Sequence, residues 1–294
     1  MNGETIALGK NALETLAARY PQLYVAPAEG AEETNRRAAG RGIRPDPATL
    51  DHFLGSERDE LRIIDTPAGP VEVLFLERRQ DFETFLQAVG HRSNPTPIAP
   101  TIGAMTYRGL PDWGKVRDAR ESYLAGGGTD WGAEFARLAK EPGAFRGELI
   151  IISAGPYSNI AAADTPYDED SWLNVSREIR LHHECAHVVC RRLLPDDILP
   201  VWDEVTADVV GLLCACDTYD TMLADRFLGI SKEGYVGGRL IEYLDDEQKN
   251  RVDEIAREVS AATASIATLA RDREANTDPF SFLLDLKRNP LVEY

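Results

Sequence analysis

The stretch REIRLHHECAHVVCRRLLP, residues 177–195, decides how the chain is interpreted, because it holds three of the chain's five histidines within six positions. It contains HECAH, residues 183–187, an HExxH pattern inside an otherwise apolar run. On a helix, residues four apart lie one turn above each other on the same face, so both imidazoles can reach one metal ion. The stretch therefore predicts a helix that carries a metal site.

The residues next to this histidine pair take different positions around the predicted helix. Glu184 lies on the rim of the face formed by His183 and His187, where it can take a proton from an attacking water without binding the metal itself. His182 points about 100° away from His183, so we expect it to make a polar contact rather than to bind the same ion.

A third ligand is expected from the next predicted helix, because a catalytic zinc site needs three protein ligands and one open position. WDEVTADVVGLL, residues 202–213, offers Glu204 after a gap of 16 residues from His187. A turn at Pro195 to Pro200 would fold this helix back across the first. Asp208, one turn after Glu204, can accept a hydrogen bond from the far nitrogen of a ligand histidine. Gly211 leaves room for the two helices to approach closely.

HExxH followed at this range by ExxAD resembles the gluzincin group of zinc metallopeptidases, in which the third ligand is the glutamate of an ExxSD or ExxAD helix. The resemblance implies His183, His187 and Glu204 as zinc ligands, Glu184 as general base and Asp208 as the partner of a ligand histidine. It covers about 26 residues closely, together with the strand-then-helix order before them. The 16-residue gap is slightly shorter than in the large gluzincin families, which favours a distinct branch.

The implied activity is hydrolysis of a peptide bond by a zinc-activated water, with Glu184 carrying the proton to the leaving amine. A tetrahedral oxyanion also needs a second electrophile. Tyr235, Arg239 and Tyr243 recur every four residues in EGYVGGRLIEYL, residues 233–244. They form one stripe if that segment is helical, and they are then the candidates; a plain core or surface stripe is the alternative.

Two other functions stay open. One is a regulatory or binding protein of zincin fold whose metal is structural. The other is a metal-dependent hydrolase of a non-peptide substrate, which only the lining of the cleft would distinguish from a peptidase.

The predicted fold is α+β and zincin-like, in two lobes behind an N-terminal helical segment at residues 1–57, where Ile6 and Leu13 are among the apolar positions at helical spacing. Residues 58–199 form a mixed-sheet lobe with the HExxH helix, and residues 200–294 form a helical lobe that carries the third ligand. The zinc is expected between the two lobes, where ligand sites commonly form.

Local patterns place the other elements. Residues 61–66 and 71–77 read as the strands of a hairpin around a Pro/Gly turn, and residues 79–89 as an amphipathic helix closed by Gly90. Residues 91–114 contain four prolines and three glycines, so we expect an ordered covering loop there.

The strongest strand signal is GELIIISAGPYSNI, residues 147–160. By resemblance it would be the edge strand that pairs with an extended peptide substrate, and its alternative is a buried central strand. The HExxH helix is expected over residues 172–194, with Asp170 or Ser171 as its N-cap and Pro195 as its stop.

Composition limits the partners. The excess of 49 acidic over 32 basic residues gives a formal charge of −17, which repels nucleic acid and anionic membranes and leaves a peptide or protein as the expected substrate. The N-terminal residues show no signal-peptide pattern and no 18-residue apolar stretch occurs, so the expected location is cytoplasmic. Four cysteines between residues 185 and 216 lack a CxxC pattern, and we expect buried reduced thiols.

Overall fold

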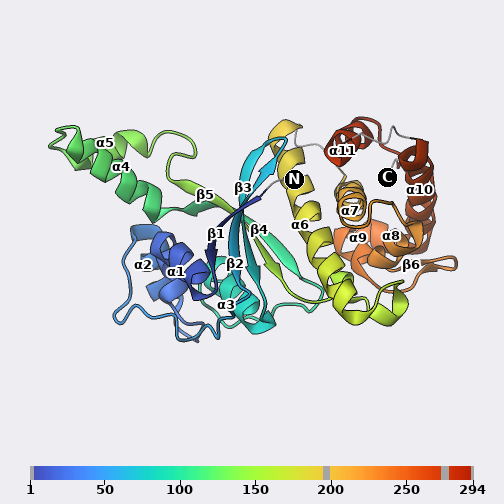
Figure 1. The fold of residues 1–294 in the computed structure, drawn as a ribbon, viewed down its shortest axis with the longest axis horizontal. Helices are drawn as coiled ribbons and strands as arrows, with labels where there is room; N and C mark the ends of the chain where they lie inside the picture. Colours follow the sequence, from blue (N-terminus) through green and yellow to red (C-terminus); the bar gives the residue numbers. More distant parts are fainter. Residues whose placement is uncertain (1–2, 195–198, 273–277, 293–294) are drawn as a thin grey trace. The chain divides into compact units, whose positions relative to one another are not determined.

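The computed structural model describes residues 3–194, 199–272 and 278–292 (Figure 1). The described chain is α+β, with a mixed five-stranded sheet and many helices, which confirms the predicted class at this level. It divides into two compact units. The first consists of Met1–Asp65, Pro70–Ala99 and Met105–Ser153, and the second of Thr66–Gly69, Pro100–Ala104 and Ala154–Tyr294.

The sheet forms the centre of the first unit, with strand order β1-β2-β3-β5-β4. β1 runs antiparallel to β2, and β3 runs parallel to β5 with Leu74 opposite Ile151. The predicted hairpin is confirmed as β2 and β3. The strand bounds are Gly3–Leu8 for β1, Glu60–Thr66 for β2, Gly69–Leu76 for β3, Ala104–Pro111 for β4 and Arg146–Ser153 for β5.

The helices of this unit bury apolar side chains such as Leu16, Phe82 and Phe85, none of which is measurably exposed. The predicted helix after the hairpin is α3, which ends at Gly90 as expected. The helix bounds are Lys10–Arg19 for α1, Glu32–Arg41 for α2, Arg79–Gly90 for α3, Trp113–Ala125 for α4 and Trp131–Leu138 for α5, with a 3-10 turn at Pro21–Tyr24.

Two expectations for residues 1–114 are wrong. Ile6 lies in β1 rather than in a helix, because residues 3–8 pair with β2. Gly9, whose φ is 57°, then separates this strand from α1. Residues 91–114 are not all loop, since β4 forms at Ala104–Pro111. β4 lies at the edge of the sheet, where a proline at the strand end is tolerated.

The predicted edge strand is also wrong, because β5 lies between β3 and β4. Leu149, Ile150, Ile151 and Ile152 are at most 1% exposed. A strand that is paired on both sides and covered on both faces carries a continuous apolar run, so the alternative of a buried central strand is the correct one.

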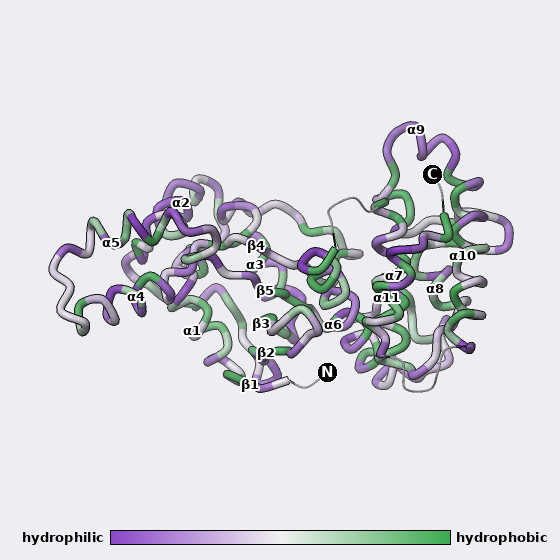
Figure 2. Tube along the Cα trace, turned by 90° about the horizontal axis from the view of Figure 1, so that it is seen from above, coloured by the Kyte–Doolittle hydropathy of each residue, from purple (hydrophilic) through white to green (hydrophobic). Residues whose placement is uncertain are grey.

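The second unit is mainly helical. Its longest helix, α6, packs against α7, which in turn packs against α11. Figure 2 shows green, hydrophobic stretches of the chain at α7 and α11, with purple, hydrophilic stretches among them. The helix bounds are Glu169–Leu193 for α6, Pro200–Cys216 for α7, Thr221–Leu228 for α8, Asp246–Lys249 for α9, Val252–Asp272 for α10 and Pro279–Arg288 for α11. The two-residue strands Ile230–Ser231 (β6) and Gly234–Tyr235 (β7) form a small ladder, and 3-10 turns occur at Tyr157–Asn159, Ala162–Asp164 and Arg239–Tyr243.

The two predicted helices of the site are present as α6 and α7. α6 begins earlier than expected, and its N-cap is Asp168, whose carboxylate accepts from the Ser171 amide at 2.8 Å. α7 spans the predicted residues 200–216. A Cβ on Gly211 would lie 3.0 Å from the carbonyl oxygen of Ile179 in α6, so the glycine allows the close helix approach that the sequence predicted.

The observed division differs from the predicted lobes, since α6 and α7 both belong to the second unit. Their mutual packing through Ile179 and Gly211 explains this, because it joins the HExxH helix to the helices that follow it. Of the predicted turn at Pro195 to Pro200, residues 195–198 lie outside the described residues, and so does the predicted stop at Pro195. Among the described helices, none has the length and apolarity required to cross a membrane.

Candidate metal centre

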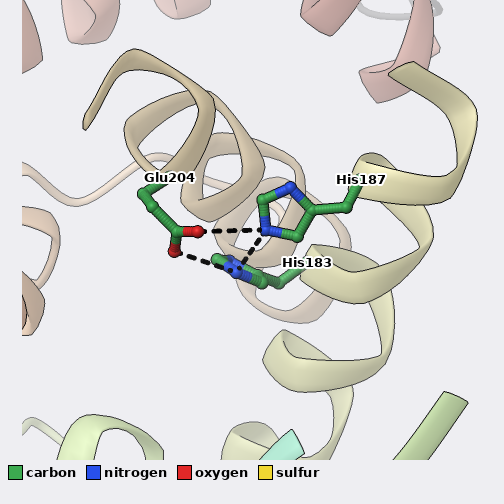
Figure 3. Close-up of side chains that lie close together, drawn as sticks. All are labelled: His183, His187 and Glu204. Carbon is green, nitrogen blue, oxygen red and sulfur yellow. Dashed lines mark hydrogen bonds and ion pairs between the residues drawn. The ribbon is translucent and has the colours of Figure 1, made fainter. Parts of the chain in front are cut away.

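Three predicted ligands converge in the second unit (Figure 3). His183 and His187 project from consecutive turns of α6 toward Glu204 on α7. The two Nε2 atoms are 3.0 Å apart, and each lies 3.4 Å from one carboxylate oxygen of Glu204. All candidate ligand atoms lie within 4.8 Å of one another, and both imidazoles are buried. These three residues could therefore hold a metal ion.

The far nitrogens of both imidazoles are held by carboxylates. His183 Nδ1 lies 2.8 Å from Asp208 Oδ1, and His187 Nδ1 lies 2.8 Å from Asp203 Oδ2. An ionised carboxylate can only accept, so each Nδ1 carries a proton and each Nε2 of a neutral imidazole presents a lone pair. Two lone pairs at 3.0 Å repel each other unless a cation or a proton lies between them.

The charges around the pair favour a cation. Burial lowers the pKa of His187, but hydrogen bonds to Asp203 and Glu204 outweigh it and raise the pKa to about 10. Burial has the opposite effect on Glu204 and by itself would raise its pKa. The interactions of Glu204 with the two imidazoles outweigh burial, so the pKa of Glu204 lies well below its usual value. With both imidazoles neutral, three carboxylates against the cationic Arg239 and Lys287 leave the cluster net negative, which favours an added proton or cation. A divalent cation would take the place of the proton.

Asp208 is the centre of a buried network that the sequence predicted only in part. Its Oδ1 accepts from the Tyr157 hydroxyl at 2.6 Å, and its Oδ2 accepts from Arg239 Nη2 at 2.6 Å. The Tyr157 hydroxyl also lies 3.0 Å from His183 Nδ1. Sequence reasoning missed Tyr157, because it lies in a short 3-10 turn after β5 and belongs to no spaced motif.

The predicted stripe of Tyr235, Arg239 and Tyr243 does not exist as one helix face. Tyr235 lies in β7, with its hydroxyl bonded to the backbone of Gly238, and Gly237 has a φ of 101° that no helix adopts. Only the 3-10 turn that begins at Arg239 returns to the site. The backbone before this turn is not helical, so a spacing of four residues does not place the three side chains on one face.

Arg239 and Tyr243 do reach the cluster from that turn. Arg239 Nη1 lies 3.7 Å from Glu204 Oε2, while Nη2 is bonded to Asp208. Burial raises the pKa of Tyr243; the charge of Arg239 opposes this effect, and the charges of Glu204 and Asp208 add to it. The structure thus brings two of the three predicted oxyanion candidates to Glu204 and leaves Tyr235 outside.

Glu184 and His182 are the neighbours of His183 along α6. Glu184 is half-buried and directly follows His183 in α6. His182 stays outside the cluster and makes a polar contact, with Nε2 3.7 Å from Glu178 Oε2. The prediction that His182 does not share the ion agrees with this placement.

An Arg239→Met substitution is expected to destabilise the protein by about 3 kcal/mol, because it leaves the fully buried Asp208 without its cation. Urea unfolding measures this loss. As a control, Arg251→Met removes an exposed ion pair with Glu254 and should leave the unfolding midpoint unchanged. An unchanged midpoint for Arg239→Met, together with a loss of turnover, would instead assign the guanidinium to the reaction.

Comparison with protein-family models gives a match over nearly the whole chain. Residues 3–292 match the family described as "Family of unknown function (DUF7005)". No curated protein and no solved structure matches the chain significantly. The family match includes the HExxH helix, the Glu204 helix and the turn that carries Arg239. Because it covers nearly the whole sequence, the chain belongs to the DUF7005 family of unknown function.

Proposed function

We propose that the protein is a zinc-dependent peptidase of the gluzincin type. The observation that carries the proposal is the convergence of two imidazole Nε2 atoms and the Glu204 carboxylate, with each Nδ1 held by its own carboxylate. Carboxylate–histidine pairs of this kind orient the ring and raise its basicity toward a metal ion.

The donor set fits zinc. Two histidines and one glutamate are a known catalytic ligand set, which leaves one of four positions open. Two nitrogens bound to one zinc ion at about 2.0–2.1 Å lie roughly 3.3 Å apart, close to the 3.0 Å between His183 and His187 Nε2. The side chains are therefore arranged for the ion with little movement.

A zinc ion at this position would polarise the scissile carbonyl and lower the pKa of a water molecule to about 7. Glu184 then takes the proton of the attacking water and passes it to the leaving amine. Its place beside His183, outside the ligand set, suits a group that must exchange protons. Tyr243, whose pKa is raised by burial and by the charge of Glu204, is the candidate donor to the developing oxyanion, because Arg239 is already committed to Asp208.

The proposal is tested by metal analysis and peptide cleavage together. We expect about one zinc ion per chain after purification, and cleavage of an unstructured protein such as casein that is lost with a chelator and restored by zinc. Protein without a stoichiometric transition metal would sink the proposal. Zinc without cleavage of casein or of a diverse peptide library would favour the structural-metal alternative.

A further inference from the structure

Each imidazole of the site is held by a carboxylate, and each of these carboxylates is held by a buried cation. Arg239 bonds to Asp208 behind His183. On the other side, Lys287 Nζ donates to Asp203 Oδ1, while Asp203 Oδ2 lies 2.8 Å from His187 Nδ1. The gluzincin pattern supplied the first of these chains through Asp208. The second one, Lys287–Asp203–His187, belongs to no motif in the sequence.

Lys287 is deeply buried for a lysine. Its side chain is 1% exposed, and it extends from α11, far along the sequence from Asp203. A buried ammonium group is unfavourable unless an opposite charge compensates it, and here Asp203 does so. The charge therefore has a specific partner, and that partner contacts a candidate ligand.

The position of Lys287 depends on how α11 packs against α7. The Trp202 indole Nε1 donates to the Leu286 carbonyl at 3.1 Å, and Phe282 and Leu286 join the same apolar cluster as Val205. This packing sets the lysine opposite the first turn of α7, where Asp203 directly precedes Glu204. The last described helix thus contacts the site through one charged side chain.

We propose that Asp203 and Lys287 are positioning residues for His187, so that α11 is part of the metal site. Lys287 fixes one oxygen of Asp203, the other oxygen fixes His187 Nδ1–H, and the imidazole then directs its Nε2 at the ion. The inference rests on the proposed zinc function. Without Lys287, the charge of Asp203 is uncompensated and its Oδ1 loses a hydrogen bond. The imidazole of His187 is then no longer held in one orientation.

The test is the zinc dissociation constant, measured by chelator competition, and the visible absorption spectrum of the cobalt-substituted protein. Lys287→Met and Asp203→Ala should each weaken zinc binding about 10–100-fold and change the cobalt bands. The double variant Asp203→Asn with Lys287→Met keeps an acceptor for His187 Nδ1–H and removes both buried charges. It should recover most of the lost affinity, which a loss of folding would not allow.

A matched control separates positioning from helix docking. Trp202→Phe removes the indole hydrogen bond to Leu286 but keeps an aromatic ring in the apolar cluster that docks α11, so it should lower the melting temperature and leave the zinc affinity and cobalt spectrum unchanged. The inference is overturned if Trp202→Phe weakens zinc binding as much as Lys287→Met does, or if Lys287→Met lowers only the melting temperature. Wild-type protein that binds no zinc would overturn the proposed function first, and the inference with it.

Discussion

A Glu184→Gln variant is expected to keep its zinc and to lose about 10²–10⁴-fold in kcat for peptide cleavage. The amide has nearly the shape of the carboxylate, so the helix and the ligands are preserved, but it cannot take a proton. Because Glu184 does not belong to the His183, His187 and Glu204 cluster, removing its charge leaves the ligand set complete. Metal content and steady-state kinetics on the same preparation measure both halves of this expectation.

The matched control for this variant is Glu178→Gln on the same helix. Glu178 is 46% exposed at its side chain and contacts His182, outside the cluster, so its loss should leave kcat unchanged. Peptide cleavage at the wild-type rate by Glu184→Gln would remove Glu184 from the mechanism. A biological function that survives the substitution in the absence of cleavage would favour the regulatory alternative, with a structural metal.

A His187→Ala variant is expected to weaken zinc binding on the order of 10³-fold, more than the 10–100-fold typical of a residue that only contacts a ligand. It removes one of three donors and leaves Asp203 paired with Lys287, so the fold should persist. Zinc should therefore stabilise the wild type, by about 4 kcal/mol at a free concentration a thousand times the dissociation constant, and the variant hardly at all. Thermal unfolding with and without zinc measures the difference.

His182→Ala is the control for this experiment, because His182 neighbours the pair in sequence but lies outside the cluster. Its zinc affinity should equal that of the wild type. If His187→Ala still binds one zinc ion per chain with wild-type affinity, the ion is held elsewhere and the assigned ligand set is wrong.

The parts of the site that could be predicted share one property, which is that helical periodicity determines them. His183 and His187 are one turn apart on α6, and Glu204 and Asp208 are one turn apart on α7. Within a helix, the number of residues between two side chains determines their relative direction, so a four-residue repeat predicts a shared face. The close crossing at Gly211 followed from the same helix pair.

Failures occurred where backbone geometry is not periodic. Tyr235 does not share a face with Arg239 and Tyr243, because Gly237 and Gly238 interrupt the predicted helix. Residues 3–8 form a strand because they pair with β2. β5 became an interior strand because β4 formed inside a segment rich in proline and glycine. Strand neighbours are set by pairing between distant segments, which local propensity does not encode.

The amino-acid sequence alone determined the two helices of the site and the residues that share a face on each, because helical spacing is a local property. Only the tertiary structure decided what surrounds these residues. Tyr157 reaches His183 from a turn after β5, Arg239 reaches Asp208 from a 3-10 turn, and Lys287 reaches Asp203 from α11. Each contact joins segments that meet only when apolar faces pack, so no spacing in the sequence could have indicated them.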